Sequence, residues 1–220
     1  MNRLTDAIKH LIIINVILFV APQLLNLDFT NILALHFPKN SNFGLWQYVT
    51  HMFMHGSFAH ILFNMYGLWA FGTPLEQMWG KKKFIFFYFS AGIGAGIIYT
   101  LVNYYQFNGI YELFTSAGLN SDEILAILEK GSTNDARVIN AISQEQFNKI
   151  TSLYNTPAVG ASGAIYGVLV AFGLYFKDAK LALIFFPVPI AAKYFIPGMI
   201  LIDLFFGMTK YSVGNIAHFA

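Results

Sequence analysis

Residues 84–105 read FIFFYFSAGIGAGIIYTLVNYY, a run without one charged side chain that directly follows three lysines at 81–83. A helix needs about 20 apolar residues to cross the ~30 Å hydrocarbon core of a bilayer, so this run predicts a membrane span. Hydrophobic residues make up 56% of the 220-residue chain, and only 11% of its residues are charged. Soluble domains carry about 25% charged residues. The composition therefore predicts a protein embedded in lipid.

Net charge and cysteine content exclude several other classes. Thirteen basic and eleven acidic residues give a formal charge of +2, so no strong field attracts nucleic acid and we expect no such partner. The chain has no cysteine, which excludes a disulfide scaffold, a thiol nucleophile and a thiolate metal site.

Further apolar segments surround the first one. The expected spans are 11–25, 58–78, 84–105, 159–176 and 194–208, with a sixth segment that begins near residue 213. The first run also fits a secretory signal peptide, but the later spans favour an uncleaved helix. Residues 26–57 and the proline-containing stretch 181–193 are expected to lie at the membrane interface. The pattern predicts an all-α polytopic membrane protein with a single membrane domain over residues 1–220.

Residues 213–220 supply only ~12 Å of helix at 1.5 Å per residue. Because this is well short of the hydrocarbon core, we expect the sixth helix to be truncated in this chain.

Residues 107–157 interrupt the apolar pattern. They contain six acidic and three basic residues. Within them, 121–130 and 135–150 resemble short amphipathic helices that begin near Ser, Asn or Asp. We expect an extramembrane insert between the third and fourth spans, and a lid or a substrate-docking surface would be a role for it.

The distribution of basic residues predicts the orientation. With the N-terminus inside, eight basic residues lie on the inner side and five on the outer side, and the acidic insert lies outside. This favours a cytoplasmic N-terminus, as in a protein of the bacterial inner membrane.

Polar side chains in a membrane span are candidates for function because burying them in lipid is costly. His60 and Asn64 lie four residues apart on one face of the second span. Ser162 lies near the start of the fourth span, between Gly160 and Gly163, and His218 lies near the start of the sixth. In the predicted orientation, all three clusters lie toward the outer face.

Simpler interpretations remain open for each residue. A serine in a membrane helix usually bonds to its own backbone or joins two helices. His51 and His55 have the spacing of a metal-binding pair but lack the glutamate of a zinc-protease helix, so no metal is expected. Glu76 and Asp203 lie in different spans, without the motif of a paired-aspartate protease.

The more specific hypothesis is hydrolysis by an activated serine, which needs a base and hydrogen-bond donors for the oxyanion. Ser162 would be the nucleophile, with small neighbours that let a substrate backbone approach. His60, Asn64 and a backbone N–H near Ser162 could supply the donors. The base should come from another helix, where His218 is the candidate.

Two motifs resemble those of the rhomboid intramembrane serine proteases: WQYVTHMFMHGSFAHILFN at 46–64 and GASGAIYG at 160–167. The resemblance implies a Ser–His dyad in a cavity open to the outer side, without cofactor or metal, that cleaves single-span transmembrane proteins. Ser162 matches the nucleophile, and His60 and Asn64 match the oxyanion positions. Tyr166 matches an aromatic residue that packs against the catalytic histidine.

Two features depart from that family's pattern. Gln47 stands where many members have arginine after the tryptophan, and the chain ends two residues after His218, before the glycine of the family's Ala-His-x-x-Gly motif. The base is therefore either His218 or a histidine beyond residue 220. A catalytically inactive relative that binds transmembrane helices is the alternative function. A small transporter is less favoured because the polar clusters lie near helix ends.

Overall fold

The computed structural model describes residues 4–183 and 186–208. Most of this part is helical, and its strands form one antiparallel hairpin. The helices of the main bundle are α1 (Asp6–Leu25), α4 (Phe58–Gly67), α5 (Thr73–Trp79), α6 (Lys81–Ser116) and α10 (Ser162–Tyr175). The mostly helical architecture is therefore confirmed, whereas residues 213–220, with the expected sixth helix and His218, lie outside the described residues.

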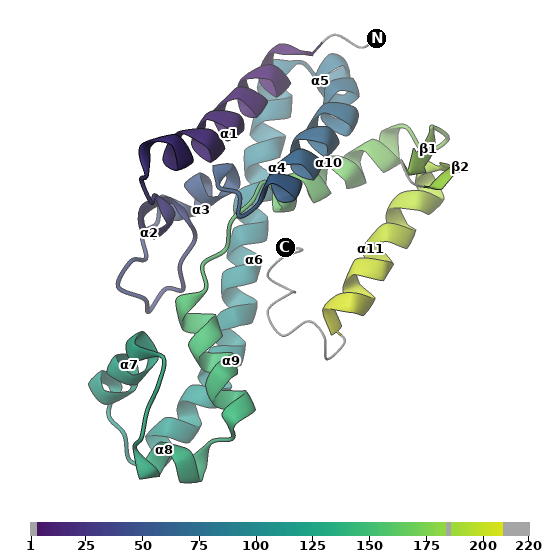
Figure 1. The fold of residues 1–220 in the computed structure, drawn as a ribbon. Coiled ribbons are helices and arrows are strands. Elements are labelled where there is room, and N and C mark those ends of the chain that lie inside the picture. Colours follow the sequence, from purple (N-terminus) through teal and green to yellow (C-terminus); the bar gives the residue numbers. More distant parts are fainter. Residues whose placement is uncertain (1–3, 184–185, 209–220) are drawn as a thin grey trace.

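Helix α6 is the longest element and runs through the whole molecule (Figure 1). Its 36 residues span ~54 Å, much more than a bilayer core requires. Phe86, Ile98, Leu101 and Tyr105 are each more than 60% exposed along its first two thirds. Such a row of exposed apolar side chains fits contact with lipid. Among the described helices, α1 and α6 are long and apolar enough to cross a membrane.

Glycines let neighbouring elements approach α6 closely. A Cβ at Gly92 would lie 2.3 Å from the methyl carbon of Met52 and 3.3 Å from Ala164. On α10, a Cβ at Gly167 would lie 2.7 Å from that of Ala91. Because lipid tails are as apolar as the side chains, helices in a membrane associate through close van der Waals packing. Small residues at the contacts permit that packing.

The second expected span is one continuous helical segment. Helix α4 passes through a π-helical turn, Leu68–Gly72, into α5. Glu76 on α5 is buried, and its carboxylate accepts hydrogen bonds from the backbone N–H groups of Ala7 (2.8 Å) and Ile8 (3.1 Å) and from the Thr5 hydroxyl. These donors lie at the start of α1, where the first N–H groups have no partner within the helix. A carboxylate therefore attaches α1 to α5.

The segment between α1 and α4, residues 26–57, is called loop 1 below. It contains two single-turn helices, α2 (Thr30–Leu33) and α3 (Gln47–Thr50), and a 3₁₀ turn, His51–Phe53. It packs against the middle of α6, where a Cβ at Gly96 would lie 3.2 Å from the His51 ring.

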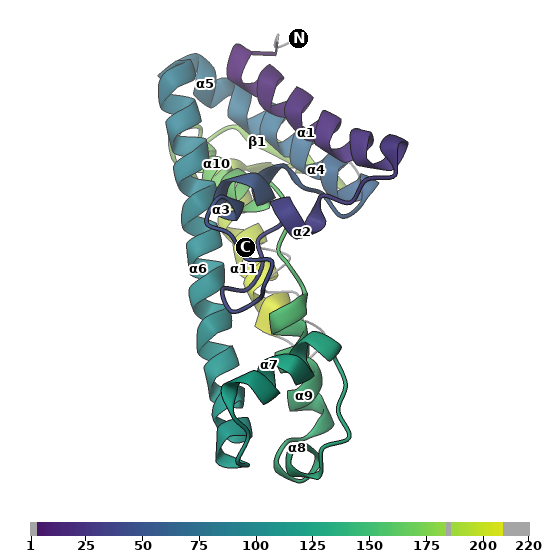
Figure 2. The same ribbon diagram turned by 90° about the vertical axis from the view of Figure 1, so that its left-hand side faces the viewer.

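Three short helices form a second core at the far end of α6 (Figure 2). They are α7 (Ser121–Lys130), α8 (Ala136–Ala141) and α9 (Gln144–Asn155). The helix expected over 121–130 corresponds to α7. The single helix expected over 135–150 is wrong, because Ser143 caps a new helix there by accepting from the Gln146 N–H. Its side chain and that of Gln146 form a capping box, which starts α9 and separates it from α8.

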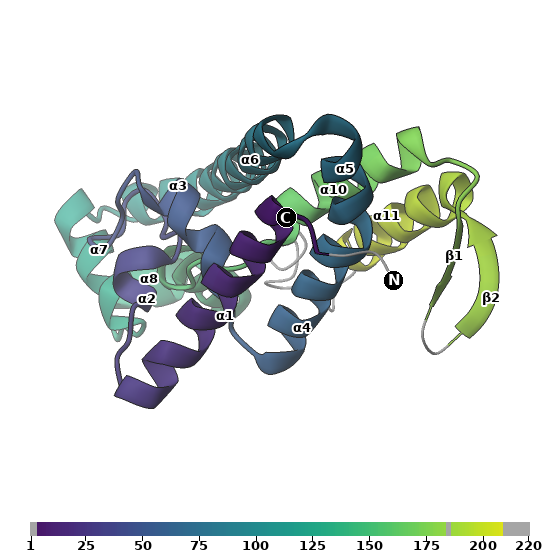
Figure 3. The ribbon, with the colours of Figure 1, turned by 90° about the horizontal axis from the view of Figure 1, so that it is seen from above.

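Beyond α10 the chain forms a hairpin of β1 (Lys180–Leu183) and β2 (Phe186–Ala191), and then α11 (Ala192–Met208). Seen from above, the hairpin projects away from the bundle (Figure 3). Helix α11 returns to α10, where a Cβ at Gly173 would lie 2.9 Å from Ile196. The hairpin occupies the stretch that was expected to connect two spans.

Candidate active site

Ser162 is the first residue of α10. The backbone ladder of this helix begins with the N–H of Ile165, which donates to the Ala161 carbonyl at 3.0 Å. The N–H groups of the first helical turn have no intrahelical acceptor and carry a partial positive charge. The Ser162 side chain thus stands beside backbone donors suited to a developing negative charge.

Gly160 brings Ser162 and His60 to one place. Its φ is +126°, in a region that only glycine adopts readily, and its N–H donates to the His51 carbonyl at 2.9 Å. A Cβ on Gly160 would lie 2.7 Å from His60 Nε2 and 3.5 Å from Ser162 Oγ. The imidazole and the hydroxyl therefore border the same small space, which exists because residue 160 has no side chain.

Asn64 lies one turn after His60 on α4. It is only 7% exposed, and its Nδ2 has no hydrogen-bond partner within the described part of the chain. An unpaired buried donor costs about 1–3 kcal/mol. Such a group is suited to bind an acceptor that arrives from outside the protein.

The remaining predicted site residues follow Ser162 on α10. Gly163 and Tyr166 are both partly buried, and Tyr166 lies one helical turn from Ser162. The structure thus brings Ser162, Gly160 and His60 together, places Asn64 and Tyr166 one turn from His60 and Ser162, and does not describe His218.

A small pocket, partly open to solvent, adjoins the serine. Its lining includes Ser162, Gly160, Ala158, His51 and Tyr99. The His51 ring is buried, and its Nδ1 lies 2.7 Å from the Gln47 carbonyl oxygen. Because a carbonyl can only accept, Nδ1 carries the proton, and burial lowers the pKa of His51, which keeps the ring neutral.

The ring of His55 packs against the ring of His60. The two ring centroids are 5.0 Å apart in an edge-to-face arrangement. Burial, and then the proximity of His60, lower the pKa of His55 to about 4. His55 therefore stays neutral at pH 7 and puts no charge beside the candidate site. This pairing could not be predicted from local spacing, because a bend in the chain separates residues 55 and 60.

Gln47 holds loop 1 together. This residue stands where many members of the family that the motif resembles have arginine. Gln47 has no exposed surface. Its Oε1 accepts from the His36 N–H at 3.1 Å, and its Nε2 donates to the Asn42 carbonyl at 2.8 Å. A neutral amide thus crosslinks this loop, where an arginine would bring a buried charge.

Apolar helices around a serine at a helix N-terminus, with a histidine beside it, define an integral membrane protein whose candidate site has components of a serine hydrolase. The chain belongs to the Rhomboid domain family, whose family model matches residues 42–121 and 136–220. Residues 122–135, which include most of α7, lie between the two matched stretches.

Curated relatives include proteases from several organisms. The chain is 29% identical over 130 residues to the rhomboid protease AarA of Providencia stuartii, which covers 59% of this chain and 34% of the relative. It is 29% identical over 138 residues to the mitochondrial rhomboid protein 1 of Saccharomyces cerevisiae (62% and 27%). It is 43% identical over 53 residues to the rhomboid protease GlpG of Salmonella newport (24% and 19%). These matches span about a third or less of each relative's length.

Proposed function

We propose that this chain is an intramembrane serine endopeptidase that cleaves single-span transmembrane proteins near the outer membrane–water interface. The observation that carries the proposal is the juxtaposition of Ser162 Oγ with the His60 ring across Gly160. The chain also belongs to a family that includes named proteases, which supports the same reaction.

In the proposed first step, Ser162 Oγ attacks the carbonyl carbon of the scissile peptide bond. A histidine base takes the hydroxyl proton, and His218 is the candidate for that role. The carbonyl oxygen becomes an oxyanion, which accepts hydrogen bonds from His60, from Asn64 Nδ2 and from backbone N–H groups at the start of α10. The base then protonates the leaving amine as the peptide C–N bond breaks.

The acyl-enzyme formed in this way is an ester of Ser162. Water attacks it, the histidine removes a proton from that water, and the ester bond breaks to release a carboxyl product and the serine hydroxyl. Water is therefore needed at the site, and the solvent-connected pocket beside Ser162 supports that requirement.

The proposed location places Ser162 toward the outer face, with a cytoplasmic N-terminus in a bacterial inner membrane. The basic residues at 81–83 support this orientation, since short inner loops carry an excess of lysine and arginine. The charged helices α7–α9 would then form an extramembrane insert on the outer side.

The test uses the purified 220-residue chain in proteoliposomes with a fluorogenic transmembrane substrate and a fluorophosphonate probe. Wild type should cleave the substrate and bind the probe covalently, and Ser162→Ala should lose both. Ser90→Ala is the matched control, because Ser90 is an exposed serine on α6 remote in sequence from the site. Labelling that persists in Ser162→Ala would refute the nucleophile. A folded wild type that binds transmembrane peptides but neither cleaves nor labels would instead indicate an inactive relative.

His218→Ala tests the base separately. Loss of cleavage with normal folding assigns the proton transfer to His218, and retained cleavage assigns it elsewhere.

A further inference from the structure

The proposed reaction makes no use of residues 107–157, yet these residues fold around a second hydrophobic core. Phe107, Phe114, Ile124, Leu128 and Ile150 are fully buried in the core that α7, α8 and α9 form with the end of α6. Capping boxes begin both α7 and α9. Residues 107–157, called the module, therefore have a core and well-defined helix ends. Such a module can hold two segments that contact it in a fixed position relative to each other.

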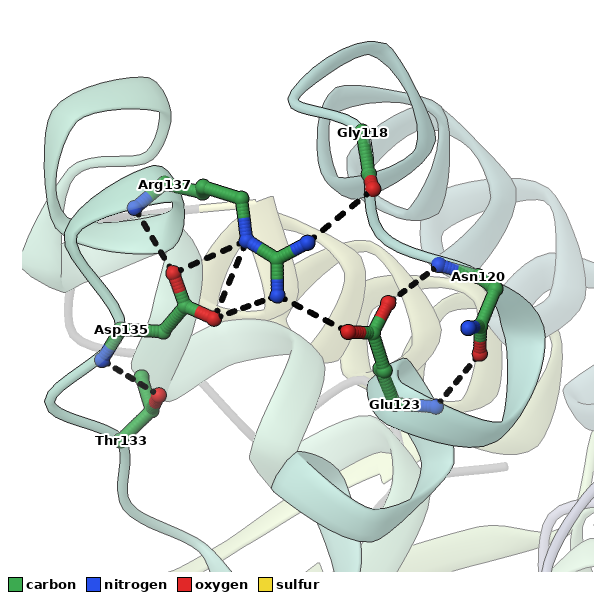
Figure 4. Close-up of polar contacts among 6 residues, drawn as sticks. All are labelled: Gly118, Asn120, Glu123, Thr133, Asp135 and Arg137. Carbon is green, nitrogen blue, oxygen red and sulfur yellow. Dashed lines mark hydrogen bonds and ion pairs between the residues drawn. The ribbon is translucent and has the colours of Figure 1, made fainter.

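Arg137 cross-links three segments of the module at its surface (Figure 4). Its guanidinium contacts the Asp135 carboxylate at 2.7 Å and the Glu123 carboxylate at 2.9 Å, and it donates to the Gly118 carbonyl at 3.2 Å. One side chain therefore connects the segment before α7, α7 itself and the start of α8.

The module also contacts loop 1. The Phe37 ring is buried 4.5 Å from that of Phe107, centroid to centroid. The Lys39 ammonium lies 4.3 Å from the centroid of the Tyr111 ring, within the range of a cation–π interaction. Asn40 Nδ2 donates to the Tyr154 carbonyl at 2.9 Å, at the end of α9. Three successive types of contact thus hold residues 37–40 against α6 and α9.

From Tyr154 the chain continues directly to the candidate nucleophile. Ala158 pairs with Leu35 through two backbone hydrogen bonds of 2.8 and 2.9 Å, and Gly160 donates to His51. The segment 156–161 is therefore clamped along loop 1, and its start is set by the end of α9. Loop 1 and this segment are both positioned by the same module.

We infer that the insert is a brace for the catalytic segment: by holding Asn40 to Tyr154, it keeps residues 156–161 in register with loop 1 and so positions Ser162. Asn40, Lys39 and Tyr154 are positioning residues that do not touch the substrate. The catalytic part of this inference rests on the proposed function, whereas the structural part does not. Displacing a reacting group by ~1 Å can cost ~10²-fold in rate, so a loosened brace has a measurable effect.

The decisive variant is Asn40→Asp. Aspartate keeps the Oδ1 that accepts from the Asn42 N–H at 2.9 Å, but it removes the donor and puts a negative charge beside the Tyr154 carbonyl. Asn42→Asp is the matched control, since it adds the same charge to an exposed position in the same turn.

Three measurements are compared in the two variants: the rate of fluorophosphonate labelling of Ser162, the kcat and KM for a transmembrane substrate, and amide hydrogen exchange over residues 156–162. Asn40→Asp should label about tenfold or more slowly, lose kcat rather than raise KM, and exchange faster at Ala158 and Gly160. Asn42→Asp should match wild type in all three. Lys39→Gln should show a weaker form of the defect. Lys39→Arg should behave like wild type, because a guanidinium retains the cation–π contact.

Equal labelling rates and equal exchange in the two aspartate variants would overturn the brace. A rise in KM with unchanged labelling would also overturn it and would assign the insert to substrate docking. If wild type neither labels nor cleaves, the proposed function fails, and amide exchange over 156–162 still decides whether the insert positions this segment.

Discussion

Gly160→Ala is the sharpest perturbation of the candidate site, because it adds a single methyl group at the point where His60 and Ser162 meet. The added Cβ would lie 2.7 Å from His60 Nε2, so the imidazole must retreat to at least the 3.4 Å of ordinary van der Waals contact. The backbone at residue 160 has a φ of +126°, where an alanine is strained. The substitution therefore acts on both the ring and the backbone.

Each effect has a magnitude. Strain at such a φ costs about 1–3 kcal/mol, which either destabilises the fold or turns the backbone away from its hydrogen bond with His51. If His60 is an oxyanion donor, its displacement removes one such donor, a loss worth about 10²–10³-fold in kcat. We therefore expect cleavage to fall by at least two orders of magnitude, with little change in KM.

The assay is cleavage of a transmembrane substrate in proteoliposomes, normalised to the folded fraction from thermal unfolding in detergent. Gly94→Ala is the matched control, because a Cβ there meets nothing within 4 Å. This control should cleave like wild type. A Gly160→Ala protein that remains folded and cleaves at the wild-type rate would refute the placement of His60 in the reaction.

Three further outcomes are expected. Glu76→Gln turns an amide N–H₂ toward the N–H donors at the start of α1, so it should lower the free energy of unfolding by about 1–3 kcal/mol; denaturant titration in detergent checks this against exposed Glu112→Gln, and an equal small effect would contradict the role of Glu76. The folded-state pKa of His55, about 4, lies below the usual unfolded value of ~6.5, so wild type should lose stability as the pH falls from about 6.5 toward 4, and His55→Gln should show a flatter profile of melting temperature against pH. Asn64→Ala should lower kcat by about 10²-fold without a matching rise in KM, and an unchanged kcat would exclude its amide from the oxyanion site.

Much of the helical architecture could be predicted, because a membrane span needs a long apolar run that one sequence displays directly. The run 58–78 corresponds to the continuous helical segment of α4 and α5, and 84–105 lies within α6. The extension of α6 to Ser116 was not predicted, because Glu112 and the polar residues around it end the uncharged run, although Phe107, Ile110 and Phe114 have helical spacing. The hairpin was missed because Pro187 and Pro189 suggested an irregular connection, although proline is tolerated on strands with a free edge.

The candidate site shows a similar division. The spacing of His60 and Asn64 and the small residues around Ser162 are local signals, so the sequence indicated them. The φ of Gly160 and the approach of His60 to it depend on how α4 packs against α10, which no local pattern reports. The interaction of Asn40 with Tyr154 was beyond prediction for the same reason, since each residue alone is an ordinary loop or helix-end residue.

The contact between Asn40 and Tyr154 has a consequence for the order of events during biosynthesis. The two residues are 114 positions apart, and a ribosome that adds about 5–20 residues per second needs roughly 6–23 seconds to make the chain between them. Throughout that time the Asn40 side chain lacks the carbonyl group to which it donates, and the serine at the start of α10 has not yet been translated. Closing so long a loop also slows folding relative to helix–helix contacts between neighbours. The nascent protein would therefore begin its passage into the bilayer without an assembled candidate site, and the proposed hydrolytic activity would appear only after the last of these contacts forms.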